Sequence, residues 1–288
     1  MTWVIFATCT AIFESLKDVT SKHSLQKIDE YIVSWSVMAF SLPLLLPILL
    51  LIKIPTLNSQ FWLTLLVDGS LNVIALIMYI KAIKLSDLSL TVPLIAFTPL
   101  FLLITSPLIV QEYPTITDAI GIFLIVTGSY ILNLKEKQKG YLAPFKSLLQ
   151  QKGSKLMLGV AFIWSITSNI DKLGVQNSSP TFWAISLCGF LALSLLPIAL
   201  YKSSHNFQLI PQYLPELLPL GLFNGAAILF QMQAISIALV AQVISVKRTS
   251  AMITVFLGYL IFQEQGIKER ATGAGIMILG VILITAGG

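Results

Sequence analysis

Charged residues are scarce in this chain of 288 residues, since Asp, Glu, Lys and Arg make up 11% of it and hydrophobic residues 56%. A soluble domain carries about 25% charged residues, because its surface faces water. The composition therefore excludes a soluble enzyme, a DNA-binding domain and a disordered adaptor. It predicts an integral, multi-pass membrane protein in contact with the lipid bilayer, and we expect it in the plasma (inner) membrane.

Residue patterns that bind metals or nucleotides or that carry out catalysis are also lacking. Cys9 and Cys188 lie in apolar segments without CxxC or Cys/His spacing, so we interpret them as small core residues and predict no metal site. The sequence contains no GxxxxGK[ST] motif and no catalytic constellation, which indicates neither an ATP-driven pump nor an enzyme, and no cofactor. The net charge of +5 comes mainly from lysines between apolar segments, so we expect no nucleic-acid partner.

Long apolar segments are what the chain does have. About 20 apolar residues cross the roughly 30 Å of hydrocarbon in a bilayer, and ten segments meet this requirement. We predict an all-α polytopic fold with helices at 2–21, 31–52, 60–80, 88–111, 116–134, 156–175, 180–201, 213–235, 240–263 and 270–287. The basic linker loop 135–155 then separates a first five-helix repeat, 1–134, from a second, 156–288.

The two halves match at one constant offset. This offset aligns Gly69 with Gly221, Asn72 with Asn224, Gly121 with Gly273, and Gly128 with Gly280. Because five is an odd number, the second copy enters the bilayer from the opposite side. The pattern predicts two inverted repeats, as in many secondary transporters, with a site near the midplane. The glycines of the fifth span in each half predict close helix packing, that is, a scaffold.

Each fourth span ends on Gln-Glu, as LIVQE at 108–112 and LIFQE at 260–264, and a fifth span with glycines follows. At both glutamates we expect an interfacial charge or a helix cap. With the duplicated unit, these features resemble the EamA family of the drug/metabolite transporter superfamily. The resemblance implies transport of small organic solutes and cytoplasmic termini. The lysine distribution predicts instead that the 135–155 loop is cytoplasmic and the termini are outside.

Charged side chains within apolar spans are functional candidates, because burying each costs about 2.5–3.5 kcal/mol. Glu14, Lys17 and Asp18 lie at helical spacing on one face of the first span. They either bind solute, with Glu14 as the proton-coupling candidate, or form an ion-pair set that neutralises itself.

Polar and aromatic residues of three other spans are further candidates for solute binding. Trp164 and Asn169 belong to a polar arc on the sixth span, where Trp164 either packs against solute or fills space between helices. Asn72 and Asn224 either orient a solute or make an interhelical hydrogen bond. Pro99, with Pro93 and Pro107, is expected to bend the fourth span.

Lys247 and Arg248 interrupt a long charge-free stretch in the ninth span. The pair resembles one in sugar-phosphate and nucleotide-sugar translocators, which implies a solute with an anionic group. The alternative is that Glu14, Asp18, Asp68 or Asp171 neutralises the pair. We therefore predict a secondary transporter that works by alternating access, as monomer or homodimer, with proton or exchange coupling. A structural or sensory subunit, or an intramembrane enzyme, is the alternative function.

Overall fold

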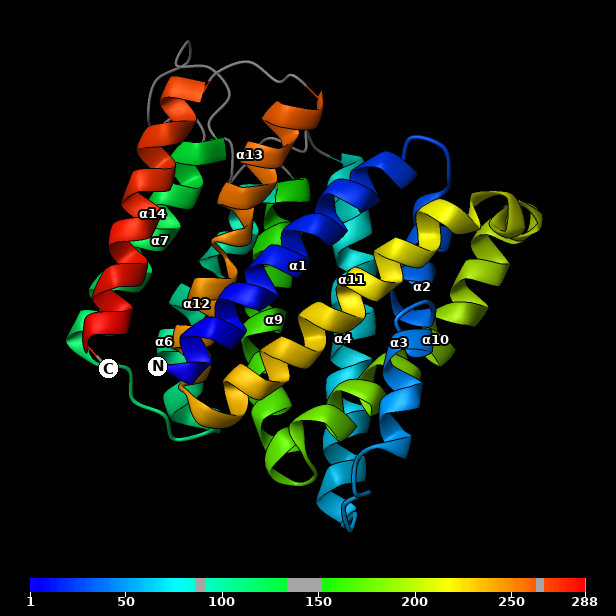
Figure 1. Cartoon of the computed structure of the whole chain (residues 1–288), viewed down its shortest axis with the longest axis horizontal. Helices are drawn as coiled ribbons and strands as arrows, with labels where there is room; N and C mark the ends of the chain where they lie inside the picture. The colour runs from blue at the N-terminus through cyan, green and yellow to red at the C-terminus, as the bar shows by residue number, and fades with distance from the viewer. Residues whose placement is uncertain (86–91, 134–151, 263–266, 288) are drawn as a thin grey trace. The chain divides into compact units, whose positions relative to one another are not determined.

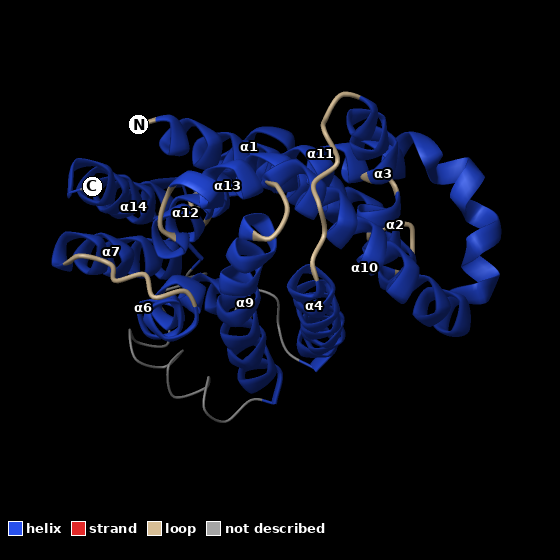
Figure 2. Cartoon of the chain, turned by 90° about the horizontal axis from the view of Figure 1, so that it is seen from below, coloured by secondary structure: helices blue, strands red, loops and turns tan. Residues whose placement is uncertain are grey.

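The computed structural model describes residues 1–85, 92–133, 152–262 and 267–287, and every element within these ranges is a helix (Figure 2). The first half contains α1 (Thr2–Ser24), α2 (Glu30–Ala39), α3 (Leu42–Leu45), η1 (Leu46–Leu50), α4 (Ser59–Leu85), η2 (Val92–Phe97), α6 (Thr98–Ile109) and α7 (Ile116–Asn133). The second half contains α9 (Lys152–Gln176), α10 (Pro180–Ser203), η4 (Ser204–Leu209), α11 (Ile210–Ile237), α12 (Val240–Lys247), α13 (Ser250–Phe262) and α14 (Ile267–Gly287).

Each predicted apolar segment holds one helix or several consecutive helices. Most of the predicted linker 135–155 lies outside the described residues, as does Glu264. Within the described ranges, three stretches are long and apolar enough to cross a membrane, namely Glu30–Leu50, Ser59–Tyr79 and Pro180–Ile237. These properties belong to an integral membrane protein.

The helices form two compact units, and neither unit is one half of the sequence. The first unit contains Met1–Val73 and Ile170–Ala238, and the second contains Ile74–Asn169 and Leu239–Gly288. Each unit therefore combines helices from both repeats, and α4 and α9 contribute to both units. Contacts between repeats hold each unit together.

Helices α7 and α14 lie side by side in the second unit (Figure 1), joined through glycines. A Cβ atom on Gly121 would lie 2.7 Å from the carbonyl oxygen of Gly280, and one on Gly128 would lie 2.6 Å from that of Gly273. Gly121 matches Gly273 in the repeat, and Gly128 matches Gly280. These crossed contacts require the two helices to run antiparallel, and they confirm that the glycines pack the helices closely.

We predict that Gly280→Ala destabilises the protein whereas Gly275→Ala does not. The new methyl group at Gly280 would lie 2.6 Å from the carbonyl oxygen of Gly121, but nothing lies within 4 Å of the equivalent position at Gly275. Overpacking costs about 1–3 kcal/mol, whereas alanine in an open helical position gains up to about 1 kcal/mol over glycine. The midpoint of thermal unfolding of the purified proteins measures both effects. Equal midpoints for the two variants would contradict the proposed packing.

Antiparallel packing recurs in the first unit between α2–α3 and α10, the second helices of the two repeats. The carboxylate of Asp29, at the start of α2, accepts a hydrogen bond of 2.5 Å from Ser203 at the end of α10. Leu45 of α3 packs against Ile185 and Cys188, nearer the start of α10. The equivalent helices therefore run in opposite directions in this unit as well.

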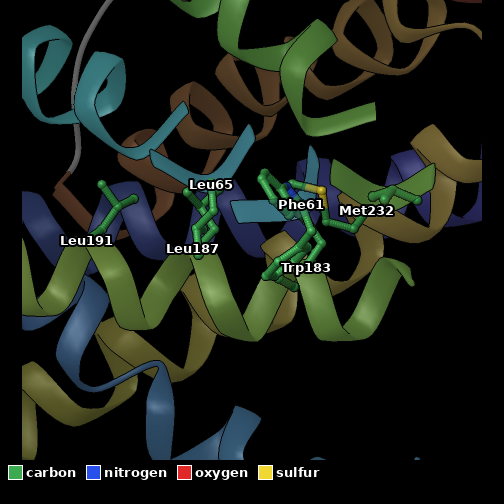
Figure 3. Close-up of a cluster of buried hydrophobic side chains, with 8 residues drawn as sticks. Phe61, Leu65, Trp183, Leu187, Leu191 and Met232 are labelled. Atoms are coloured by element: carbon green, nitrogen blue, oxygen red, sulfur yellow. The ribbon is translucent and has the colours of Figure 1, made fainter. Parts of the chain in front are cut away.

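The apolar core of the first unit joins α4, α9, α10 and α11. Figure 3 shows Trp183 of α10 beside Phe61 of α4, whose rings are 5.8 Å apart at an angle of 86°. The buried members of this cluster are Phe61, Leu65, Val175, Trp183, Ala184, Leu187, Leu191 and Met232. An edge-to-face ring pair of this kind adds about 0.5–1.5 kcal/mol to the effect of area burial.

The prediction of one helix over 31–52 is wrong in detail, because the chain breaks between α2 and α3. Pro43 lies in the first turn of α3, and a second proline begins η1. A proline inside a continuous helix would remove a hydrogen bond and clash with the preceding turn. The hydroxyl of Ser41, at the break, donates to the carbonyl oxygen of Gly221 in α11 at 2.9 Å.

Candidate functional site in the second unit

The fourth span of each repeat is divided into two helices at the same place. In the first repeat η2 ends at Phe97 and α6 begins at Thr98. The ninth span, predicted as one helix over 240–263, is divided between α12 and α13, with Arg248 and Thr249 at the junction. The repeat offset aligns Phe97 with Thr249. Discontinuous helices at matching positions in two repeats are typical of transporter binding sites.

The break in the ninth span occurs without a proline. The backbone N–H and the hydroxyl of Thr249 both donate to the carbonyl oxygen of Val246, at 3.0 and 2.7 Å. The backbone N–H of Arg248 is shared between the carbonyl oxygens of Ile244 and Ser245, at 3.1 Å each. These local bonds replace the regular helical pattern and close α12 with a tight turn.

The break corrects the prediction of one continuous helix over 240–263. Gln242 donates to the buried carboxylate of Asp118 at 2.9 Å, and Ser245 donates to the carbonyl oxygen of Ala241 at 2.5 Å. The Gln242 bond thus joins α12 to α7, whereas the Ser245 bond lies within α12. Lys247 is half-buried at the last position of α12, one residue before the turn that carries Arg248.

Four residues of the second unit surround this turn, and we call them the Arg248 cluster: Tyr79, Thr98, Trp164 and Arg248. A terminal nitrogen of Arg248 donates to the hydroxyl of Thr98 at 3.1 Å. The guanidinium carbon lies 5.8 Å from the ring centre of Trp164, which in turn lies 6.0 Å from the ring of Tyr79. A cation over a desolvated tryptophan ring is stabilised by about 2 kcal/mol.

The Arg248 cluster is suited to binding an anionic group. Arginine has five N–H donors in a rigid plane that matches carboxylate and phosphate, and Trp164 and Thr98 orient this plane. The half-buried guanidinium belongs to the second unit, together with Thr98 and Trp164. Sequence reasoning found Trp164 and Arg248. It missed Tyr79 and Thr98, because only the fold brings them to the turn.

Asn169, another candidate, joins α9 to α6. Its amide oxygen accepts from Ser106 at 2.8 Å, and its amide nitrogen donates to Thr105 at 3.0 Å and to the carbonyl oxygen of Ser165 at 2.8 Å. The side chain is fully buried. Its donors and acceptor are thus used within the protein, which indicates a structural contact between helices.

The Gln-Glu motif at 111–112 closes α6 and caps α12. Gln111 has a φ of 56°, a left-handed conformation that ends the helix, and the N–H of Glu112 reaches back to the carbonyl oxygen of Ser106 at 3.3 Å. The turned chain brings the Glu112 carboxylate within 2.7 Å of the backbone nitrogen of Val240, in the first turn of α12. Of the two expected roles, the structure shows the cap, which places a negative charge at the positive end of the helix.

Candidate residues in the first unit

Glu14, Lys17 and Asp18 form an ion-pair set on α1. The ammonium group of Lys17 lies 2.7 Å from the carboxylate of Glu14 and 3.8 Å from that of Asp18. The Glu14 side chain is 15% exposed and that of Asp18 is 44% exposed. The set therefore neutralises much of its own charge, which was one of the two alternatives for these residues.

Asn72 and Asn224 match in sequence but differ in their contacts. The amide nitrogen of Asn224 donates to Ser41 at 3.0 Å, so it joins α11 to the break between α2 and α3. The amide nitrogen of Asn72 instead donates within α4, to the carboxylate of Asp68 at 3.2 Å and to its carbonyl oxygen at 3.1 Å. The repeat offset aligns Asp68 with Leu220, so this carboxylate has no counterpart in the second copy.

Helices that are duplicated in two repeats and broken at equivalent positions are typical of membrane transporters. The sequence model of the EamA-like transporter family matches residues 1–134 and 151–286. The chain therefore belongs to the EamA-like transporter family. The two matched ranges show that it contains two copies of the family unit.

Comparison with solved structures supports the fold. One crystal structure, described only as that of a protein, superposes with a TM-score of 0.80 at 13% sequence identity, covering 99% of this chain and 96% of the other. At this identity the similarity shows the fold alone. No curated protein matches the sequence.

Proposed function

We propose that this protein is a secondary transporter for a small organic solute with an anionic group, and that Arg248 binds this group. The proposal includes ten membrane crossings in two inverted repeats of five. The observation that carries it is the position of Arg248, held by Thr98 and Trp164 at the break of a charge-free span. Placing an arginine within a membrane span costs free energy, so an arginine at such a position normally serves a function.

The proposed binding step uses the planar guanidinium as a fork for carboxylate or phosphate. The indole of Trp164 and the ring of Tyr79 offer an aromatic wall beside it, against which an apolar part of the solute packs. Lys247 adds a second, movable positive charge one residue away. Alternating access then follows from rocking of helices around the broken fourth and ninth spans.

Glu14, Lys17 and Asp18 belong to the same proposal as residues of the solute pathway on α1. In this function their internal ion pairs rearrange when solute binds, because a carboxylate or lysine released from its partner attracts the polar groups of the solute. Their half-buried positions at 15% exposure for Glu14 and 18% for Lys17 support this assignment. Asn72 and Trp164 contribute hydrogen bonding and packing.

Solute counterflow in proteoliposomes tests the proposed function. Vesicles that contain the purified protein are loaded with unlabelled amino acids, sugar phosphates or organic acids and then given the labelled compound. We expect counterflow of at least one anionic class and none of its neutral analogue, whereas protein-free vesicles show no exchange. Counterflow of neutral or cationic compounds alone would refute the anionic selectivity, and no counterflow of any class would refute transport.

A further inference from the structure

Asp68 is an acid in the middle of an apolar helix. The stretch Ser59–Tyr79 of α4 is one of those long and apolar enough to cross a bilayer, and Asp68 lies at its centre. An ionised carboxylate at this depth costs about 2.5–3.5 kcal/mol on insertion scales. This cost disappears when the carboxylate is neutralised by a partner or by a proton.

Among the residues that the structure describes, no lysine or arginine forms an ion pair with Asp68. The side chain has an exposed fraction of 0%, and within the described ranges its only side-chain hydrogen bond comes from the neutral amide of Asn72. Its second oxygen, Oδ1, is buried without a hydrogen-bond partner. A buried acceptor without a partner costs about 1–3 kcal/mol, and more when it carries charge. A proton on Oδ1 removes that charge.

Another carboxylate, that of Asp171 on α9, interacts electrostatically with Asp68. Asp171 itself accepts a hydrogen bond of 2.8 Å from the indole nitrogen of Trp183. The neighbouring Lys172 directs its ammonium group to the carbonyl oxygen of Ala238 at 2.8 Å. Other titratable groups on the helices that share an apolar core with α4 are Glu30 and Tyr31 on α2, Cys188, Tyr201 and Lys202 on α10, and Tyr213 and Glu216 on α11.

We propose that Asp68 is the proton-binding residue of this transporter, carrying one proton on Oδ1. The proposal rests on the proposed function only for its coupling role. The proton comes from water on one side of the membrane, neutralises Asp68, and returns to water on the other side after the helices rearrange. Because Asp68 is fully buried in the described conformation, exchange with water takes place in another conformation of the cycle.

Glu14 offers a matched comparison, since it was the coupling candidate from sequence. Its carboxylate is paired with Lys17 at 2.7 Å, a contact that stabilises the ionised form. Asp68 has a neutral amide in place of a lysine. Glu14 thus has a positive charge beside it, whereas Asp68 is bonded to a neutral amide. A proton therefore stabilises Asp68 more than Glu14.

Infrared spectroscopy of the purified protein tests the site without any solute. A protonated carboxylic acid has a carbonyl stretching band that a carboxylate lacks. We expect such a band in the wild type at neutral pH, its loss in Asp68→Asn, and its retention in Glu14→Gln. Absence of the band from the wild type, its persistence in Asp68→Asn, or its loss from Asp171→Asn with retention in Asp68→Asn would overturn the assignment. Thermal unfolding of each variant confirms that it is folded.

Transport measurements test the coupling role separately, with an anionic solute identified by counterflow. Counterflow needs no net proton movement, so Asp68→Asn is expected to retain it within about twofold. Accumulation driven by an imposed pH gradient is expected to fall at least tenfold, to the level seen without a gradient. Loss of both activities in a folded Asp68→Asn protein, or retention of both, would overturn the coupling role. Failure of the wild type to transport any solute would refute the proposed function and leave the infrared result to decide the proton site.

Discussion

Replacement of Arg248 by methionine is expected to lower counterflow of the anionic solute about 100-fold, because a charge-assisted hydrogen bond contributes about 1.5–3 kcal/mol and each 1.4 kcal/mol is a factor of ten. The guanidinium is the group that Thr98 and Trp164 hold in place. Arg248→Lys keeps the charge but loses the planar fork, so a smaller reduction of about tenfold is expected. Initial rates in proteoliposomes measure both effects.

Lys202→Met is the matched control for this experiment. Lys202 also lies over an aromatic ring, 5.3 Å from the centre of Tyr201, but it is exposed in the last turn of α10. Its removal is expected to leave counterflow unchanged. Undiminished transport by both Arg248→Met and Lys247→Met would end the anion-binding assignment. Transport that is lost in Arg248→Met and restored by removing a carboxylate as well would favour the structural ion-pair alternative.

Trp183→Ala is expected to lower the midpoint of thermal unfolding by on the order of 10 °C. Trp183 has an exposed fraction of 0% and fills the core between α4, α9 and α10 (Figure 3). A cavity from a truncated buried aromatic costs about 3–5 kcal/mol, and each kcal/mol shifts the midpoint by about 2–4 °C in a domain of 150–250 residues. The truncation also leaves the Asp171 carboxylate without the indole donor.

Two further variants separate the contributions at this position. Trp62→Ala removes the same side chain where it is 59% exposed, and the midpoint is expected to change by less than about 2 °C. Trp183→Phe keeps most of the ring but loses the donor to Asp171, so an intermediate decrease is expected. A similar midpoint for Trp183→Ala and Trp62→Ala would contradict the assignment of Trp183 to the core.

The positions of the helices were largely predictable from sequence, because apolar length and charge are local properties. The predicted segment 116–134 became α7 (Ile116–Asn133), and 180–201 became α10 (Pro180–Ser203). The glycines of the fifth and tenth spans were also predictable as packing residues, since glycine has little other use in a lipid-facing helix. The family unit was recognisable from the repeated Gln-Glu ends, and the match over both halves confirms it.

Helix breaks were less predictable where no proline marks them. The chain turns at Arg248 because Thr249 forms two bonds to the carbonyl oxygen of Val246, a local choice that apolar periodicity does not reveal. The helix that Glu112 caps was likewise not predictable, because the cap joins two residues that are far apart in the sequence. Its carboxylate caps a helix whose first residue, Val240, lies in the other repeat.

The sequence by itself determined that this protein is a duplicated helical membrane protein. The length of the apolar segments, their charge and the repeat offset can all be read directly from the order of residues. Only the tertiary structure decided which polar residues are already satisfied, since hydrogen bonds join positions far apart in sequence. Asn169 and Asn224 became contacts between helices. Asp68, which the sequence presented only as a partner for the basic pair, is buried with one oxygen that has no hydrogen-bond partner among the described residues, and Asn72 of its own helix donates to the other oxygen.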